Sequence, residues 1–344
     1  MPRITLEDVA KIAGVSSKTV SRVLNNEPNV ASETFDKVQR TIAELNYVPN
    51  LAARNLSRGR SMAIGLTMGW PVTSAFTSTL IDFAMRESAE NGYSLALFSL
   101  ETGISKKIVD AFRGKQIDGI ILDTRTADDQ DLIYQLDSLN VPYVVIHPNQ
   151  RTSFEKTSIV RIDDQLAAQQ ATDYLIRLGH ASIGLISHDL ELKQQDERLK
   201  GYLSALKNAN LPFRDEWIAK GSGSEFQVGF SGILKLLPHN QELSAIFMET
   251  DEIAMGALSA LWKMGMKVPD DISVIGFDDI PYASMIVPPL TTIHQPIDKI
   301  ASVAVKQLIK AIDDPNARPI DIVMPTRLVI RDTCKARTLE RAKR

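Results

Sequence analysis

The chain has 344 residues, of which 44% are hydrophobic, and this is enough for a small head and two larger lobes with cores of their own. The net charge of −3 is unevenly distributed, because residues 1–60 carry nine Lys/Arg against six Asp/Glu and the remaining residues carry 30 against 36. A basic N-terminal part on an acidic body is typical of a protein that binds a polyanion with one end.

Cysteine content and apolar run lengths limit where such a chain can work. The single cysteine, Cys334, excludes an internal disulfide and a cysteine metal cluster, which suits a reducing compartment. No apolar run is long enough to span a membrane, and the first residues lack the apolar core of a signal peptide. We therefore expect a cytoplasmic protein with no membrane partner.

The first part of the chain is predicted to form two short helices joined by a tight turn. Thr5 begins the first helix, and Asp8 follows at the spacing of a capping box. Gly14 supplies the backbone freedom for the turn, and Ser16 caps a second helix at about residues 17–25. The apolar face of the first helix is expected to consist of Leu6, Val9, Ala10 and Ile12.

The second helix has two contrasting faces. Its buried face is expected to contain Val20, Val23 and Leu24, and its outer face contains Ser17, Lys18, Ser21 and Arg22. A third helix, capped by Ser32, would pack through Phe35, Val38, Ile42 and Leu45. This pattern indicates a helix-turn-helix whose second helix enters the DNA major groove. On spacing alone, the alternative is a plain three-helix bundle with a solvated polar face.

A short helical segment at residues 50–57 follows this head, and Arg58-Gly59-Arg60 comes after it. The segment is too short to be a stable helix alone. A twin helix in a dimer and a DNA minor groove would supply the packing that it lacks. We therefore divide the chain into a helix-turn-helix head at 1–49, a hinge helix and linker at 50–60, and a body at 61–344.

In the body, apolar runs of strand length alternate with amphipathic helical segments. The first series has expected strands at 62–67, 94–99, 117–122 and 143–146, with helices around 80–90, 106–112 and 130–139. The second series has a strand near Ile159 and strands at 183–187, 245–248 and 272–277, with helices at 166–178, 198–207 and 253–264. Such alternation predicts an α/β body of two doubly wound parallel-sheet lobes, as in periplasmic binding proteins. Extra elements at 291–294 and 297–312 predict a hinge of several strands.

Polar side chains are expected where the two sheets face one cleft, because the carboxyl ends of the strands in such folds surround the ligand. At strand ends they are His147, Thr250, Asp251, Asp278 and Asp279, with Gln295 after the strand 291–294 and Arg198 at the start of a helix. Carboxylate and guanidinium groups make charge-assisted hydrogen bonds to vicinal hydroxyls, so the set favours a polyhydroxylated ligand. The alternative for each residue is an ordinary helix cap or turn.

Residues 5–61 resemble the lactose-repressor (LacI/GalR) family in register and without a gap, through TLEDVAKIAGVS, TVSRVLN and ELNYVPNLAARNLSRGRS. The resemblance implies that Ser17, Lys18 and Arg22 contact base edges. It implies that phosphates are held by Thr5, Ser16, Thr19, Ser21, Asn25 and Asn50, and that Leu56 with Ala53 enters the minor groove. The implied partner is double-stranded operator DNA with an inverted repeat. Ala31 and Phe35 depart from the Ser and Arg that the family often has.

The resemblance covers nearly the whole chain. DERLKGY at 196–202 is similar to the family's effector arginine motif, and ISVIGFDD at 272–279 and PPLTTIHQ at 288–295 are its most recognisable body segments. The effector ligands that this implies are Arg198, Asp278 and Gln295, with Phe76 as the aromatic side chain of the first lobe. Thr250 stands where sugar-responsive members commonly have Asn, and His147 where some have Asp. The implied effector is a small molecule of the sugar type.

An enzyme is not expected, because no catalytic constellation is present. Residues 221–226 lack the third glycine of a dinucleotide fingerprint, no phosphate-binding GxxxxGK[ST] occurs, and the five His show no metal-ligand spacing. No cofactor or metal is expected either. A periplasmic sugar receptor would share the two lobes, but it would need a signal peptide and no head. A purine-type regulator, whose ligand promotes DNA binding, stays open because of Thr250.

The tail bears on the oligomeric state. Residues 331–344 are rich in charge and contain a single leucine, so they cannot form a tetramerising coiled coil, and we expect a solvated terminus and a homodimer. The hypothesis is therefore a cytoplasmic, homodimeric repressor of carbohydrate-utilisation genes that a sugar-type effector releases from its operator.

Overall fold

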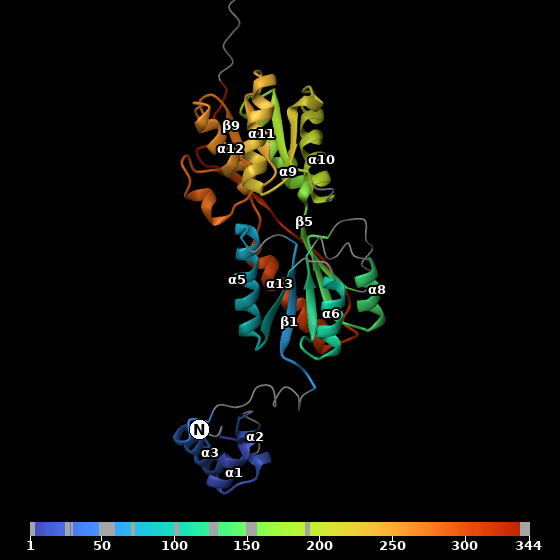
Figure 1. Ribbon diagram of the computed structural model, residues 1–344, viewed down its shortest axis with the longest axis vertical. Helices are drawn as coiled ribbons and strands as arrows, with labels where there is room; N and C mark the ends of the chain where they lie inside the picture. The colour runs from blue at the N-terminus through green and yellow to red at the C-terminus, as the bar shows by residue number, and fades with distance from the viewer. Residues whose placement is uncertain are drawn as a thin grey trace, which may run out of the picture. The chain divides into compact units, whose positions relative to one another are not determined.

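The computed structural model divides into two compact units, residues 1–61 and 62–344 (Figure 1). It describes residues 4–24, 28, 30–47, 59–69, 73–99, 103–123, 130–148, 157–189 and 193–337. The predicted hinge helix lies outside the described residues, as do Asn25, Asn50, Ala53 and Leu56. Within the described part of the chain, no helix is both long and apolar enough to cross a membrane.

The described residues of the first unit form three helices, α1 (Leu6–Ala13), α2 (Ser17–Leu24) and α3 (Ser32–Glu44). The predicted capping box is confirmed: the Asp8 amide donates to Thr5 Oγ1, and the Asp8 carboxylate accepts from the Thr5 amide at 2.9 Å. Gly14 ends α1 with φ +64°, a left-handed conformation that glycine adopts readily. The Thr19 amide donates to Ser16 Oγ at 3.1 Å, so Ser16 caps α2 as predicted.

Two details of the head differ from the sequence expectation. Ile12 is 58% exposed, and Ala13 takes the buried position, because the core-facing stripe of this short helix lies one residue further along the chain. Ser32 is the first residue of α3 and not its cap; Ala31 occupies the cap position and makes no side-chain hydrogen bond there. Phe35 packs against the core of the head.

The first lobe contains a six-stranded sheet in the order β11-β5-β4-β3-β1-β2, with every pair parallel. Its strands are β1 (Ala63–Met68), β2 (Ser94–Ser99), β3 (Gly119–Leu122), β4 (Tyr143–Ile146), β5 (Ser158–Ile162) and β11 (Asp321–Met324). Its helices are α5 (Ala75–Glu90), α6 (Ile104–Arg113), α8 (Gln130–Ser138) and α13 (Ile297–Asp313). Helices α5 and α13 pack side by side, with α6 and α8 on the other face of the sheet (Figure 1).

The second lobe contains a six-stranded sheet in the order β12-β10-β9-β8-β6-β7. Its strands are β6 (Ile183–His188), β7 (Ile218–Gly221), β8 (Ala245–Met248), β9 (Ser273–Asp278), β10 (Thr291–His294) and β12 (Arg327–Val329). Its helices are α9 (Asp164–Arg177), α10 (Lys193–Asn208), α11 (Glu225–Leu236) and α12 (Asp251–Lys263), with 3-10 turns at 215–217, 237–239 and 281–284. All pairs are parallel except β12 with β10, so the predicted doubly wound α/β fold is confirmed with one antiparallel edge.

The chain passes between the lobes three times. The crossings lie between β5 and α9, between β10 and α13, and between β11 and β12. The predicted multi-strand hinge is thus confirmed, but one assignment was wrong: the strand near Ile159 is β5, which pairs with β4 and completes the first sheet. The crossing comes after this strand and not before it. The short strands β7, β11 and β12 were not predicted.

Two glycines allow helices of the second lobe to approach closely. A Cβ on Gly229 of α11 would lie 1.8 Å from the Ile253 carbonyl oxygen, and one on Gly256 of α12 would lie 1.9 Å from the Phe226 carbonyl oxygen. Only glycine therefore fits at these positions. The contact fixes the first turns of α11 and α12 beside each other, which places the side chains of Glu225 and Thr250 together.

We expected the C-terminal segment to be a solvated terminus, but residues up to 337 make hydrogen bonds with the second lobe. The Val274 amide donates to the Thr333 carbonyl at 2.8 Å, and the Arg337 amide donates to the Leu178 carbonyl at 2.7 Å. His180 bridges Ser244 Oγ and the Lys335 carbonyl oxygen. The chain up to residue 337 is therefore part of the second lobe, and residues 338–344 lie outside the described part.

Candidate functional site

Arg198 lies at the centre of a charged cluster in the second lobe. Its side chain is only 12% exposed, and Nε donates to Asp164 Oδ1 at 2.8 Å. Nη1 donates to the Glu249 carbonyl oxygen at 2.6 Å, and Nη2 lies 3.9 Å from Asp278 Oδ1. The guanidinium carbon is 3.8 Å from the centroid of the Phe277 ring, a cation–π contact. Since α10 begins at Lys193, Arg198 lies in its second turn and not at its start.

Asp278 and Gln295 form the next contact of this cluster. Asp278 ends β9 with φ +115°, and Gln295 follows the neighbouring strand β10. Gln295 Nε2 donates to Asp278 Oδ1 at 2.6 Å, while Gln295 Oε1 is buried with no well-formed hydrogen bond among the described residues. Burial raises the pKa of Asp278 well above its usual value, although the Arg198 charge and the Gln295 amide act in the opposite direction.

The first lobe contributes His147 and Phe76. His147 directly follows β4, and its ring centroid lies 5.7 Å from that of Phe76, near the start of α5, at an interplanar angle of 60°. Burial lowers the pKa of His147, while the carboxylates of Asp123 and Asp164 and the Gln295 side chain act to raise it. His147 is therefore close to groups of both lobes.

Thr250, the sixth predicted effector residue, lies at the start of α12. It is the N-cap of α12, where its Oγ1 accepts from the Ile253 amide at 3.2 Å and donates to Glu225 Oε2 at 3.2 Å. Burial raises the pKa of Glu225 well above its usual value, and the charges of Asp278 and Glu252 add to this effect. A protonated Glu225 can donate a hydrogen bond to the Glu252 carboxylate.

The structure brings five of the six predicted effector residues, Phe76, His147, Arg198, Asp278 and Gln295, into one chain of contacts between the lobes. Thr250 lies beside this cluster: its side chain donates to Glu225, and the carbonyl of the preceding Glu249 accepts from Arg198. The sequence interpretation missed Asp164 and Glu249, which hold Arg198. Asp164 and Glu249 each follow the end of a strand by one or two residues, as the predicted residues Asp278 and His147 end or follow theirs. The cluster offers acceptors, donors and an aromatic face, as recognition of a hydroxylated ring requires.

The second candidate site is the outer face of α2 in the head. Lys18 and Arg22 are exposed and lie one helical turn apart, with Ser17 and Ser21 half-buried on the same helix. This face combines two cations with small hydroxyls, as contacts to DNA bases and phosphates require. Among the described residues, no group of three or more His, Cys, Asp or Glu could hold a metal ion.

Two family models match the chain. The model described as "Bacterial regulatory proteins, lacI family" matches residues 5–50, which include all three helices of the head. The model described as "Periplasmic binding protein-like domain" matches residues 172–334, which include most of the second lobe and the later crossings. The two matches therefore assign the two compact units to different kinds of module.

Curated relatives match nearly from end to end. The chain is 32% identical to the probable HTH-type transcriptional repressor ExuR of Bacillus subtilis (strain 168), over 97% of this chain and 99% of the relative. It is 36% identical to the ribose operon repressor of Escherichia coli (strain K12), over 90% of this chain and 94% of the relative. It is 33% identical to the HTH-type transcriptional repressor PurR of Pasteurella multocida (strain Pm70), over 97% and 99%.

Solved structures with the same architecture include two that hold a ligand. The lac repressor dimer bound to operator and the anti-inducer ONPF matches with a TM-score of 0.84 and 27% identity, covering 97% of this chain and all of that one. The complex of the transcriptional regulator CelR with cellobiose matches with a TM-score of 0.73 and 29% identity, covering 96% of this chain and all of that one. This chain therefore shares its architecture with the lac repressor dimer and with CelR over nearly its whole length.

Proposed function

Because the chain belongs to the lacI family of bacterial regulatory proteins, we propose that it is a cytoplasmic repressor of carbohydrate-utilisation genes that a sugar-type effector releases from its operator. The observation that carries this proposal is the Arg198–Asp278–Gln295 cluster, which meets His147 and Phe76 between the two lobes. The ribose operon repressor and the cellobiose complex of CelR are relatives whose names point to the same class of ligand.

The cluster suits a neutral, hydroxylated ring for a physical reason. Arg198 is already paired with Asp164 and approached by Asp278, so it carries little uncompensated charge for an anionic ligand. The carboxylate oxygens can instead accept from ligand hydroxyls while the guanidinium donates to ring or hydroxyl oxygens. The buried Gln295 Oε1, whose side chain also contacts His147, would accept a further hydrogen bond from such a ligand. Phe76 would cover an apolar face of the ring.

Release from DNA would follow from the position of the cluster. A ligand that contacts both lobes favours the lobe arrangement in which its contacts are best. If that arrangement separates two hinge helices at the operator, the ligand and the DNA must weaken each other's binding by the same factor. The protein therefore needs no catalytic step, and we propose that it is not an enzyme.

We further propose that the protein binds an inverted-repeat operator as a homodimer. The second lobe exposes apolar side chains that support self-association: on α11, Phe226 is 46% exposed and stacks on Phe230 at 6.5 Å, and after β9, Met285 is 69% exposed. Where such side chains form a contiguous patch, they mark an interaction surface. Two heads related by a two-fold axis would each read one half-site through Lys18 and Arg22.

One observation favours a second candidate function, a purine-type regulator whose ligand acts as co-repressor. The Thr250 side chain is occupied by capping α12 and by Glu225, so it is not free to take the role of the Asn that sugar-responsive members commonly have. PurR of Pasteurella multocida is 33% identical to this chain. The two candidates predict opposite signs of the ligand's effect on operator affinity.

The test is a ligand screen followed by calorimetry. Sugars, glycosides and purines are screened by thermal shift, where a ligand at 100 times its Kd adds about 2.7 kcal/mol to the free energy of unfolding. We expect Arg198→Ala and Asp278→Ala each to lower the affinity for the ligand found in the screen by about 5- to 150-fold. Arg214→Ala, which removes an exposed arginine of the same lobe, should leave the affinity unchanged.

Operator titration with and without the hit then gives the sign. A sugar that lowers operator affinity supports the first candidate, and a purine that raises it supports the second. Wild-type ligand affinity in both cleft variants would show that the effector binds elsewhere. Circular dichroism of each variant checks that it is folded, because Arg198→Ala leaves two buried carboxyl groups without their cation.

A further inference from the structure

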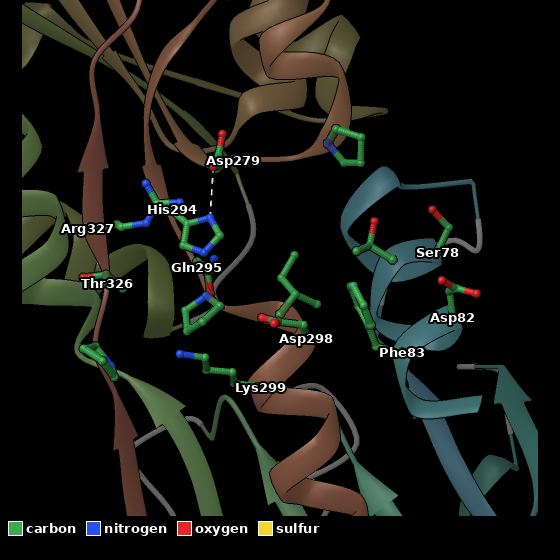
Figure 2. Close-up of a pocket in the computed structure, with 15 residues that line it drawn as sticks. Ser78, Asp82, Phe83, Asp279, His294, Gln295, Asp298, Lys299, Thr326 and Arg327 are labelled. Carbon is green, nitrogen blue, oxygen red and sulfur yellow. Dashed lines mark hydrogen bonds and ion pairs between the residues drawn. The ribbon is translucent and has the colours of Figure 1, made fainter. Parts of the chain in front are cut away.

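A cavity of about 840 Å³ lies where the chain crosses between the lobes, and we call it the crossing pocket (Figure 2). One wall comes from α5 of the first lobe, through Ser78, Thr79, Asp82 and Phe83. The opposite wall comes from the end of β10, the start of α13 and the start of β12, and it includes His294, Lys299 and Arg327. Of the six effector residues, only Gln295 borders this cavity, so the crossing pocket adjoins the Arg198 cluster at Gln295 and is otherwise lined by different residues.

The charges around the crossing pocket are unequally compensated. Asp82 pairs with Arg86 at 2.9 Å, and Asp279 pairs with Arg331 at 2.6 Å and with His294 Nδ1 at 2.9 Å. By contrast, Lys299, Arg327 and Asp298 make no ion pair within the described part of the chain. With the paired Arg86 and Arg331 included, four cations and three carboxylates lie in or next to the lining, a formal charge of +1, and its unpaired members are Lys299 and Arg327 against Asp298.

His294 is held in a fixed orientation by its contact with Asp279. Because Asp279 binds the Nδ1 edge of the ring, the Nε2 edge is directed away from Asp279, and His294 lines the cavity with 28% of its side chain exposed. Figure 2 shows His294, Arg327 and Lys299 on the same side of the cavity, opposite Ser78 and Asp82. An imidazole, a guanidinium and an ammonium group thus share one wall.

The start of α13 adds to this positive wall. The helix has 17 residues and begins at Ile297, directly after Pro296, and no side chain caps it. The unsatisfied amides of a helix start carry a partial positive charge. Ile297, Asp298 and Lys299 all line the cavity, and the Ile297 amide donates to the Gln295 carbonyl at 2.9 Å, so the partial charge beside the cavity comes from the amides that follow Ile297.

We propose that the crossing pocket is a second ligand site, which binds a hydroxylated organic phosphate such as a sugar phosphate. The phosphate would lie against Lys299 and Arg327, since arginine and lysine are the usual phosphate ligands. His294, whose Nδ1 faces Asp279, would offer Nε2 as an acceptor to a phosphate or sugar hydroxyl. The hydroxyls would lie against Ser78, Thr79 and the carboxylates of Asp82 and Asp298. Pockets of a few hundred to about 1,000 Å³ hold ligands of this size, whereas inorganic phosphate alone would leave most of the cavity empty.

Such a ligand would act on the same lobe movement as the effector. Its phosphate would be bound by crossing segments and its hydroxyls by α5, so it would contact groups on both sides of the hinge. A ligand shifts a conformational equilibrium by the difference in its affinity for the two states. The site therefore couples a phosphorylated metabolite to the operator without occupying the effector cleft.

The experiment is calorimetry on the full-length protein with ribose 5-phosphate as the probe, and with ribose and inorganic phosphate as controls. Lys299→Ala and Arg327→Ala should each lower the affinity for ribose 5-phosphate by about tenfold or more, because each removes a charged phosphate contact. The matched control is Lys310→Ala, an exposed lysine about 16 Å further along α13 at 1.5 Å per residue. It should leave the affinity unchanged.

Four results would overturn the proposal. The first is no binding of ribose 5-phosphate at millimolar concentration to the wild-type protein. The second is equal affinity for inorganic phosphate, which would show a general anion patch. The third is binding that survives in Lys299→Ala and Arg327→Ala but disappears in Arg198→Ala, which would place the probe in the effector cleft. The fourth is a loss of dimer mass in these two variants without a change in probe affinity, which would make the pocket a subunit contact.

Discussion

Glu252, in the first turn of α12 in the second lobe, accepts a hydrogen bond through Oε1 from the backbone amide of Ala75, the first residue of α5 in the first lobe, at 2.5 Å. Ser74 occupies the cap position of α5 but makes no side-chain hydrogen bond there. A side chain of one lobe therefore caps a helix of the other. Since the cap exists only when the lobes are close, it stabilises the arrangement that the structure shows.

Replacing this cap should loosen the two lobes. We expect Glu252→Ala to lower the free energy of unfolding by about 1 kcal/mol, the usual value for the loss of a helix cap. Glu252→Gln keeps an acceptor oxygen for the Ala75 amide, so its free energy of unfolding should fall by less. Urea unfolding of both variants measures the difference. Equal losses in the two variants would mean that the Ala75 hydrogen bond contributes nothing to stability.

The stability of the protein should depend on pH through Glu249. This residue is 4% exposed and accepts from the His188 amide at 2.9 Å. Burial raises its pKa to about 7, against the opposing effects of the Arg198 charge and the His188 amide. Because the folded state holds the proton more tightly than the unfolded chain, this group's contribution is fully present below the unfolded pKa and is lost as pH rises through 7.

Glu249→Gln removes this titration. Relative to the wild type, the variant should gain up to about 3 kcal/mol in free energy of unfolding between pH 4.5 and pH 8, at 1.36 kcal/mol per pKa unit. Urea unfolding at several pH values measures it. Glu90→Gln, at an exposed position, is the control and should track the wild type. A constant difference between Glu249→Gln and wild type at all pH values would contradict the prediction.

Lys18 should determine operator sequence preference. We expect Lys18→Ala to weaken the binding free energy for the specific operator by about 1–3 kcal/mol and to relax the preference for one base pair. The reason is that the side chain is exposed on the outer face of α2. Binding isotherms on the operator and on single-base variants give the numbers, with Lys207→Ala as the control. Uniform weakening on every sequence, with a salt slope reduced by about one, would instead identify a phosphate contact.

The protein in solution should have a mass near two times 38.1 kDa. Met285→Lys should shift this mass toward the monomer, because a charge would replace a 69% exposed apolar side chain after β9. Tyr134→Lys, at a 73% exposed position on α8, should not. Light scattering at micromolar concentration decides. A tetramer that persists after removal of residues 338–344 would show that another surface drives assembly.

Local signals in the sequence predicted the head more accurately than the cleft. The Thr5–Asp8 box and Gly14 act within one helical turn, so their pattern is complete in the sequence. The contacts of Arg198 with Asp164 and of Glu252 with Ala75 join residues 34 and 177 positions apart, and no periodicity reports such pairs. The strand-end rule would have selected Glu249, but only the packing of α11 on α12 shows that Glu225 approaches Thr250.

The short edge strands were missed for a related reason. β12 has three residues and β11 has four, and each is a strand only because β10 or β5 lies beside it. The strand near Ile159 was assigned to the wrong lobe because alternation along the chain gives the order of strands but not the sheet that each one joins. Its register with β4 settles the assignment.

The three crossings also determine how the gene can recombine. The first lobe is encoded by two separated stretches. The first stretch ends near residue 162, and the second runs from about 297 to 324, because β11 returns to pair with β5. A single exchange point can transfer the head or the whole body between paralogous genes, but it cannot transfer one lobe alone, because an exchange point after β5 that transfers the second lobe also replaces α13 and β11 of the first. New effector specificity in such a protein must therefore arise mainly by substitutions within the cleft, while new operator specificity can be acquired by exchanging the head.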